Sequence, residues 1–269
     1  MPGANADNYQ LNSVSRVAQV LAALDTDHGS SLREVARSSD LSEATALRYL
    51  TSLASGNMVE RDPATGVYRL GLELYRLGQR ALAQRDVHRI AMPYLRALRD
   101  EFQETVNLAS RLHHQIVMLE VLDSPRSLRK GVGPGAVDSW HSTSVGKAIL
   151  SRLPWRDIEE ILRHHPLIRL TPNTITRPER LQKDLGQSRR RGYAIDNEES
   201  DEGLKCVGAP VLDHYGEAQF AISVSGPASR MTPDRLVTVG AAVCRATADV
   251  SQELGLLDGP GSRPVGPGR

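Results

Sequence analysis

The first seventy residues carry short apolar periodicities separated by turn residues, a pattern that predicts three helices followed by a hairpin. Apolar residues repeat at spacings of three and four between residues 14 and 24, as on the buried side of a helix. Ser31 and Glu34 have the spacing of a capping box, which predicts that a second, short helix begins there. Ser42 is placed to cap a third helix.

The third predicted helix has two different faces. Its apolar face, which we expect to be buried, carries Ala46, Tyr49, Leu50 and Leu53. Its opposite face presents Glu43, Ala44, Leu47, Arg48 and Thr51. Two strand-like runs follow at 58–61 and 67–70, with turn residues between them. Two short helices, a tight turn and a hairpin wing predict a winged helix-turn-helix over residues 11–73, whose second helix enters the major groove of DNA.

The remainder of the chain mixes helical and strand-like patterns. Leucines recur among arginines over residues 74–90, which predicts a linker helix. Strand-like runs follow at 116–122 and 218–225, and in the second run apolar and small polar residues alternate. Thr232 and Pro233 are suited to begin a final helix. We therefore expect an α+β chain with a second, larger domain after the linker.

Composition limits the class of protein without naming a function. A chain of 269 residues with 40% hydrophobic and 24% charged residues can build two cores. Cys206 and Cys244 are its only cysteines, which argues against a disulfide framework. We find no signal-peptide pattern and no apolar run of the ~20 residues that a membrane helix needs. We expect a cytoplasmic protein without a membrane segment.

Charge does not favour DNA binding. Residues 11–73 hold six arginines and eight acidic residues, a net charge of −2, whereas phosphate neutralisation supplies much of the affinity of DNA-binding proteins. The prediction therefore depends on where a few arginines lie, such as Arg61 and Arg69 beside the hairpin. A small helical domain that binds protein, as in an adaptor, remains an alternative.

A series of motifs, found in order along residues 11–255, resembles the IclR family of bacterial regulators. One is His141-Ser-Thr-Ser-Val-Gly146-Lys-Ala148, and another is Gly203-Leu-Lys-Cys206. The other blocks lie at 11–16, 32–36, 41–50, 68–71, 91–95, 104–107, 192–199, 207–210 and 223–227. Each block alone is weak evidence, but the ordered set is specific.

The resemblance implies a winged helix-turn-helix joined by a linker helix to a GAF-like α/β effector-binding domain. The domains would be a flexible tail at 1–10, the DNA-binding domain at 11–73, the linker helix at 74–90, the effector domain at 91–257 and a disordered tail at 258–269. The implied partners are double-stranded, palindromic operator DNA, a small-molecule effector, and further copies in a homodimer or dimer of dimers. RNA polymerase would be a further partner of an activator. The prediction includes no enzymatic activity, cofactor or metal.

Candidate DNA contacts lie on the third helix and on the wing. The set is Glu43, Ala44, Thr45, Leu47, Arg48, Arg61 and Arg69. The family usually has proline-lysine-serine where this chain has Ser42-Glu43-Ala44. A glutamate there weakens phosphate attraction and could accept a hydrogen bond from cytosine, so the operator sequence does not follow by analogy.

Candidate effector contacts come from separate segments of the second domain. The resemblance places them at Ser144, Val145, Asp196, Leu204, Cys206, Ser223 and Ser225. Serine hydroxyls and the unpaired backbone donors of a helix beginning near Ser144 suit a small organic or aromatic acid. Asp196 fits a carboxylate ligand less simply, because it must meet a ligand hydroxyl or hold loop donors. The plainer explanation of each serine is a structural role, either as a helix cap or as a polar side chain on a strand.

Three other kinds of chemistry are alternatives to effector binding. Cys206 and His141 could form the nucleophile and base of a thiol hydrolase, although a cysteine in an apolar strand is more often buried and inert. Adjacent histidines at 113–114 and 164–165 lack the usual spacing of metal ligands. The glycines at 131–135 lack the Gly-Lys-Ser/Thr of a phosphate loop.

Overall fold

The computed structural model describes residues 12–26, 28–83, 86–112, 114–126, 133–213 and 215–255. It divides the chain between residues 84 and 85 into two compact units, which we describe separately. The predicted tails at 1–10 and 258–269 lie outside the described residues.

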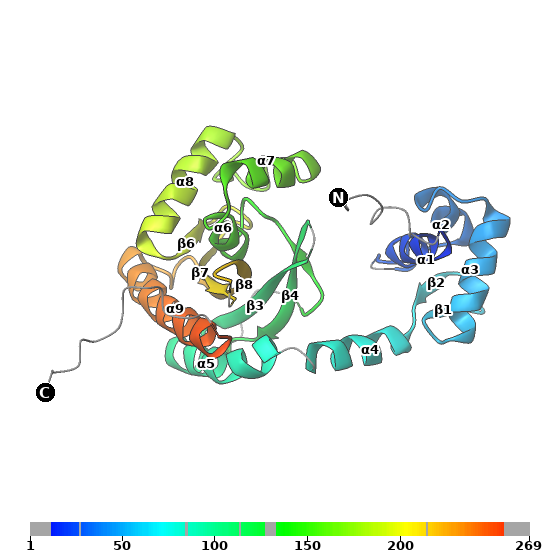
Figure 1. The fold of residues 1–269 in the computed structure, drawn as a ribbon, viewed down its shortest axis with the longest axis horizontal. Helices are drawn as coiled ribbons and strands as arrows, with labels where there is room; N and C mark the ends of the chain where they lie inside the picture. The colour runs from blue at the N-terminus through cyan, green and yellow to red at the C-terminus, as the bar shows by residue number, and fades with distance from the viewer. Residues whose placement is uncertain are drawn as a thin grey trace, which may run out of the picture. The chain divides into compact units, whose positions relative to one another are not determined.

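The first unit is a three-helix domain followed by a hairpin and a fourth helix (Figure 1). The capping box of Ser31 and Glu34 is present, and the Ser42 side chain accepts a hydrogen bond from the backbone of Thr45, so both helix starts are confirmed. One apolar core, which includes Val35, Leu50 and other residues of all three helices and the hairpin, holds the unit together. The elements are α1 (Asn12–Ala22), α2 (Leu32–Ser38), α3 (Glu43–Ser55), β1 (Val59–Arg61), β2 (Tyr68–Leu70) and α4 (Leu72–Ala83).

The hairpin is the predicted wing. Strands β1 and β2 pair antiparallel, and the Asp62 carboxylate accepts hydrogen bonds from the backbone of Ala64 and Thr65 in the turn. Gly29 has a φ of 76°, and a Cβ there would be 2.5 Å from the carbonyl oxygen of Tyr68. Only glycine therefore allows the chain after α1 to lie against β2.

The second unit is an antiparallel six-stranded sheet with helices on both faces (Figure 1). The strand order is β5-β4-β3-β8-β7-β6. The strands are β3 (Thr105–Leu112), β4 (Gln115–Leu122), β5 (Val137–Asp138), β6 (Ala194–Asn197), β7 (Leu204–Leu212) and β8 (Ala218–Pro227). The helices are α5 (Asp86–Phe102), α6 (Ser144–Leu150), α7 (Trp155–His164), α8 (Pro178–Arg191) and α9 (Pro233–Glu253).

The expected linker helix at 74–90 is divided in the structure. Helix α4 ends at Ala83 and α5 begins at Asp86, with residues 84 and 85 outside the described part of the chain. Val87 and Ile90 are buried in the core of the second unit. The leucine and arginine pattern therefore spans two amphipathic helices, of which the second belongs to the second unit.

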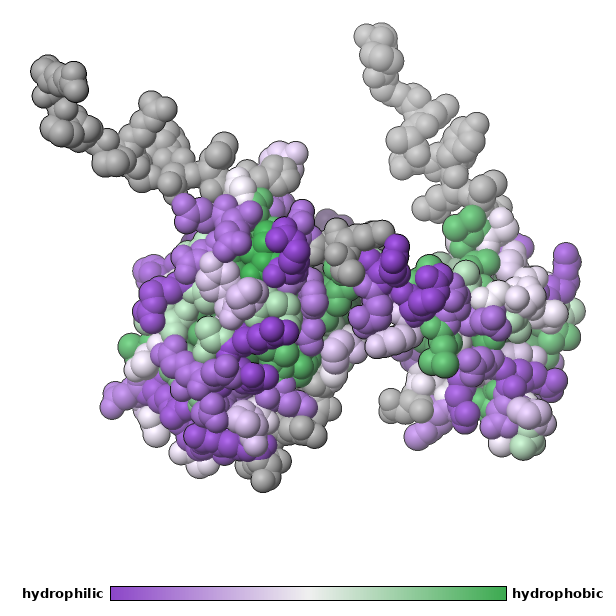
Figure 2. Space-filling model, turned by 90° about the horizontal axis from the view of Figure 1, so that it is seen from below, coloured by the Kyte–Doolittle hydropathy of each residue, from purple (hydrophilic) through white to green (hydrophobic). Residues whose placement is uncertain are grey.

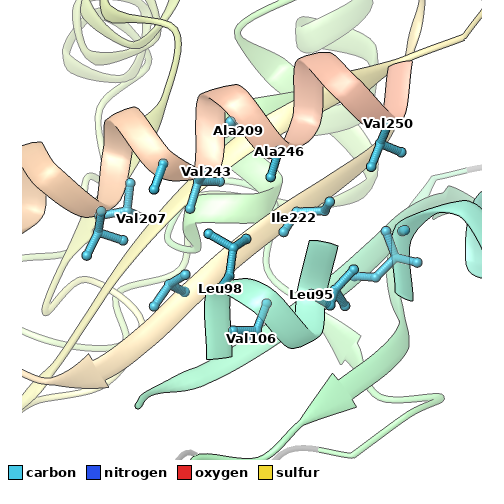
Figure 3. Close-up of a cluster of buried hydrophobic side chains, with 14 of the residues drawn as sticks. Leu95, Leu98, Val106, Val207, Ala209, Ile222, Val243, Ala246 and Val250 are labelled. Atoms are coloured by element: carbon cyan, nitrogen blue, oxygen red, sulfur yellow. The ribbon is translucent and has the colours of Figure 1, made fainter. Parts of the chain in front are cut away.

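The two faces of the sheet differ sharply in polarity. On one face, Val106, Val207 and Val224 occupy adjacent strands in register and pack with helices α5 and α9. Figure 3 shows Val106 and Val207 among the side chains of this core. Their neighbours in sequence point to the opposite face, because side chains alternate along a strand. That opposite face, which lies toward α6 to α8, carries most of the buried polar residues of the strands.

Candidate functional site

The outward face of α3 is the candidate reading surface for DNA. Ala46 and Leu50 are buried in the core of the first unit, and Glu43, Ala44, Leu47 and Arg48 are exposed. These four predicted contacts therefore share one accessible helix face.

Thr45 differs from the other predicted contacts on α3. It is half-buried, its backbone donates to the Ser42 hydroxyl at 3.3 Å, and the two hydroxyl oxygens are 2.9 Å apart. Its hydroxyl is thus engaged in the cap of α3, which orients the helix.

Both predicted wing arginines are exposed. The Arg61 guanidinium carbon lies 5.7 Å from the centre of the Tyr68 ring, a cation–π contact that orients the side chain. Arg69 Nη1 lies 3.8 Å from the Asp62 carboxylate. Turn hydrogen bonds from Thr65 and Ala64, with a smaller contribution from Arg69, lower the pKa of Asp62. Asp62 therefore stays ionised and offsets part of the Arg69 charge.

Two further arginines were not selected from the sequence. Arg33 and Arg37 lie one turn apart on α2 and are exposed. With Glu43 and neighbouring residues they line a pocket between α2 and α3, which has a volume of about 570 Å³. The sequence does contain a signal for them, since two arginines four residues apart lie in the first helix of the predicted helix-turn-helix. In this motif the first helix crosses the phosphate backbone of DNA.

The strand register brings the predicted effector residues of the sheet together. Asp196 pairs with Cys206, and Cys206 pairs with Ser225, so these three form one row across β6, β7 and β8. Ser223 and Leu204 lie two residues from this row and therefore share its face. All five are buried.

Helix α6 covers this row. A Cβ on Gly208 would be 3.0 Å from the carbonyl oxygen and 3.1 Å from the hydroxyl of Ser144, so Ser144 lies directly over β7. Ser144 and Val145 are both buried. The predicted residues from four segments thus meet between α6 and the sheet.

Two of the backbone donors at the start of α6 are already used. Thr143 caps the helix: its hydroxyl accepts from the backbone of Gly146 at 3.2 Å and its carbonyl from that of Lys147 at 3.0 Å. The N–H groups of Gly146 and Lys147 are therefore not available to a bound acid.

Asp196 holds the turn that follows β6. Its carboxylate accepts hydrogen bonds from the backbone of Glu199 at 2.7 Å and from the backbone and hydroxyl of Ser200 at 3.3 and 2.5 Å. Burial raises its pKa, although these hydrogen bonds oppose the shift. Of the two roles expected for Asp196, the structure shows the holding of loop donors.

The chain matches two domain families in the same order as the two units. Residues 13–63 match the IclR helix-turn-helix domain, and residues 79–252 match the bacterial transcriptional regulator IclR C-terminal domain. The chain belongs to the IclR family. It is a ligand-responsive, DNA-binding transcriptional regulator, as its relatives are.

Relatives and solved structures extend the IclR assignment over nearly the whole chain. The HTH-type transcriptional repressor AllR of Klebsiella pneumoniae is 34% identical over 245 residues, covering 91% of this chain and 90% of the relative. The transcriptional repressor IclR of Escherichia coli K12 is 32% identical over 249 residues, covering 91% of each chain. An IclR-type regulator from Alicyclobacillus acidocaldarius superposes with a TM-score of 0.82 at 27% identity, covering 92% of this chain and all of that structure.

IclR proteins are regulators and not normally enzymes, and the comparisons give no support to a thiol hydrolase. In the structure Cys206 is buried and His141 is already engaged. The two ring nitrogens of His141 lie 3.2 Å from the Ser139 hydroxyl and 3.0 Å from the carbonyl oxygen of Ile168. The imidazole therefore has no nitrogen left to act as a base toward Cys206.

A buried charge cluster beside the predicted effector residues was not identified from the sequence. Lys147 of α6 is fully buried, and its ammonium lies 2.6 Å from Glu199 and 3.2 Å from Asp184 of α8. Burial raises the pKa of Glu199 to about 7, and the attraction of Lys147 limits that shift. No periodicity marks these residues, because the partners are far apart in sequence.

The predicted effector residues are packed together and do not line the neighbouring cavities. A cavity of about 310 Å³ before α6 is lined by Trp140, His141 and His165, among others. Another, of about 330 Å³ beside α9, is lined by residues that include Arg152 and Cys244.

The described part of the chain holds neither a membrane-spanning helix nor a cluster of metal-ligating side chains. No helix there is long and apolar enough to cross a membrane. No group of three or more His, Cys, Asp or Glu side chains among those residues is arranged to hold a metal ion.

Proposed function

We propose that this IclR-type regulator reads its operator with the exposed face of α3 and with the arginines of the wing. Arg48 would reach base edges in the major groove, and Arg61 and Arg69 would contact phosphates. The exposure of Glu43, Ala44, Leu47 and Arg48 on one helix face supports this assignment.

We propose further that a small carboxylic acid binds between α6 and the sheet. The supporting observation is the gathering of buried polar side chains there, because burying a polar group costs free energy unless it is hydrogen-bonded. Ser223 and Ser225 are buried beside Cys206, and the buried Ser142 hydroxyl has no hydrogen-bond partner among the described residues. The acid would contact Ser144, Cys206, Ser223 and Ser225 and lie near Val145 and Leu204.

We propose a homodimer, or a dimer of dimers, as the DNA-binding form. Val14 of α1 and Leu72 and Tyr75 of α4 are 62%, 75% and 68% exposed, which is unusual for large apolar side chains. Exposed hydrophobic residues are visible among hydrophilic ones in Figure 2. One recognition helix covers few base pairs, so two copies on a palindromic operator would supply the specificity.

A DNA selection tests these proposals together. The full-length protein would select sites from a random DNA pool, and the bound sequences should share inverted half-sites. Titration of the selected site with wild type and with S223A, in the presence of a panel of small carboxylic acids, then tests the effector site. Selection of DNA without any common sequence would contradict the DNA-reading proposal, and an unchanged acid response in S223A would contradict the effector site.

A further inference from the structure

Asn107 lies at the centre of the polar face of the sheet and joins the two effector-site serines. Its side-chain Nδ2 is 3.1 Å from the hydroxyl oxygen of Ser223 and 3.1 Å from that of Ser225. All three side chains are buried. One amide group therefore contacts both hydroxyls.

The strand register explains how a single side chain reaches both serines. Asn107 of β3 is directly opposite Ser223 of β8, and Thr105 is opposite Ser225. The two serines are separated by one residue on β8 and so point to the same face. Asn107 reaches one across the ladder and the other along the diagonal.

The chemistry of the amide fixes the polarity of the two hydroxyls. An amide nitrogen donates two hydrogen bonds and accepts none, so both serine oxygens act as acceptors toward Asn107. Each hydroxyl keeps one O–H group that it must donate elsewhere. In their hydrogen bonds with Asn107 both serines are acceptors, so these bonds use neither O–H group. Two hydroxyl donors thus lie next to each other on the face covered by α6.

The carboxylate of Asp196, in the same row, does not cancel the donor character of the two serine hydroxyls. Asp196 lies in register with Cys206 and Ser225. Its oxygens already accept three hydrogen bonds from Glu199 and Ser200. The negative charge of Asp196 is thus directed to its own turn.

We propose that Asn107 is a positioning residue of the effector site, which orients Ser223 and Ser225 as a pair of donors and makes the site select a carboxylate over the corresponding carboxamide. This inference rests on the proposed effector site and adds the group that determines its specificity. A carboxylate offers two acceptor oxygens to the two O–H donors, whereas a carboxamide offers one oxygen and turns its NH₂ donor toward the second O–H group.

Replacing the amide nitrogen of Asn107 by an oxygen should reverse the direction of its hydrogen bonds with the two serines. In Asn107→Asp, the group facing the serines becomes an oxygen that accepts their O–H groups. The serine lone pairs then face the ligand, and a negative charge is added nearby. In Asn107→Ala, the hydroxyls lose their orientation but gain no opposite preference.

The test compares matched ligand pairs on the full-length protein by calorimetry. The probes are acetate and acetamide, butyrate and butyramide, and benzoate and benzamide. We expect wild type to bind at least one carboxylate about tenfold or more tightly than its carboxamide, because hydrogen bonds to a charged group are stronger than those between neutral groups. That ratio should fall several-fold in N107A and invert in N107D. An inverted preference is a change that loss of packing alone would not produce.

The controls separate this inference from the proposed site. N173D makes the same substitution at an exposed asparagine and should keep the wild-type ratio. If S223A and S225A weaken carboxylate binding but N107D keeps the wild-type ratio, the role of Asn107 is wrong and the site stands. If S223A and S225A bind the carboxylate as wild type does, the proposed site itself is wrong. Should N107D fail to fold, a wild-type ratio in N107A is sufficient to overturn the inference.

Discussion

Gly208 of β7 and Ser144 of α6 are so close that a Cβ on Gly208 would be 3.0 Å from the Ser144 carbonyl oxygen. The obstacle is backbone, which cannot rotate away as a flexible side chain could. The close packing of α6 on the sheet therefore depends on a glycine at position 208.

Gly208→Val should force α6 away from the sheet. We expect a loss of ~1–3 kcal/mol in the free energy of unfolding, the usual cost of overpacking a core, together with a weakened effector response. Urea denaturation measures the first effect. Gly186→Ala in α8 is the matched control, since a Cβ there would meet only a flexible arginine at 3.8 Å, and it should not destabilise the protein. Equal stability of G208V and wild type would contradict the close seat of α6.

Arg48→Ala should weaken operator binding by ~1–3 kcal/mol and relax base preference at one position in each half-site. The physical reason is the loss of a bidentate contact to a base edge. Fluorescence anisotropy at fixed salt, with the selected site and its single-base variants, gives both quantities. Arg180→Ala, on the exposed face of α8, removes the same charge from the other unit and should have little effect. Unchanged affinity in R48A would remove Arg48 from the reading surface.

Arg33→Ala and Arg37→Ala should act differently from R48A. If these α2 side chains contact phosphates, each substitution lowers affinity for every DNA sequence to a similar extent. It should also reduce the slope of log affinity against log salt by about 1. A salt titration with the operator and with unrelated DNA measures this. A loss confined to the operator would argue that these arginines read bases.

Glu199→Gln should flatten the pH dependence of stability. The pKa of Glu199 in the folded protein is about 7, above its ordinary value of 4.5. Between those values the folded state binds more protons than the unfolded state, so stability falls as pH rises from about 4.5 to about 7. Glutamine does not titrate, and the difference between wild type and E199Q should decline over this window. Glu179→Gln, at an exposed position, should leave the profile unchanged, and parallel profiles of E199Q and wild type would contradict the raised pKa.

Leu72→Glu combined with Tyr75→Glu should shift the protein toward monomer. Both side chains are exposed on α4, so the added charges cost little in one copy but would repel across an interface. Light scattering after size-exclusion chromatography gives the mass at micromolar concentration. Val237→Glu, at an exposed position of α9, is the control. An unchanged oligomer in the double variant would place the interface elsewhere.

The sequence predicted the first unit well because its signals are local. The capping box at Ser31, the cap at Ser42 and the strand runs at 58–61 and 67–70 act over a few residues, and the structure contains each of them. The exposure of Val14 was not expected, since periodicity shows which residues share a face but not whether another element covers it.

The second unit was harder to predict because its interactions are long-range. Lys147 meets Glu199 across fifty-two positions, and Asn107 meets Ser223 across one hundred and sixteen. Neither contact has a local pattern, so only the strand register and the packing of α6 reveal them. The effector residues were predicted from family resemblance, whereas the contacts of Asn107 and Lys147 became evident only from the geometry.

Side chains of β8 point alternately to the two faces of the sheet, so neighbouring codons in this part of the gene encode residues in different surroundings. Ile222 and Val224 belong to the apolar core, and Ser223 and Ser225 belong to the polar face. If Ser223 and Ser225 bind the effector as proposed, mutations in these two codons can alter what the protein senses and leave the core residues Ile222 and Val224 unchanged. After gene duplication, copies of such a regulator could diverge toward new metabolites while inheriting an unchanged scaffold.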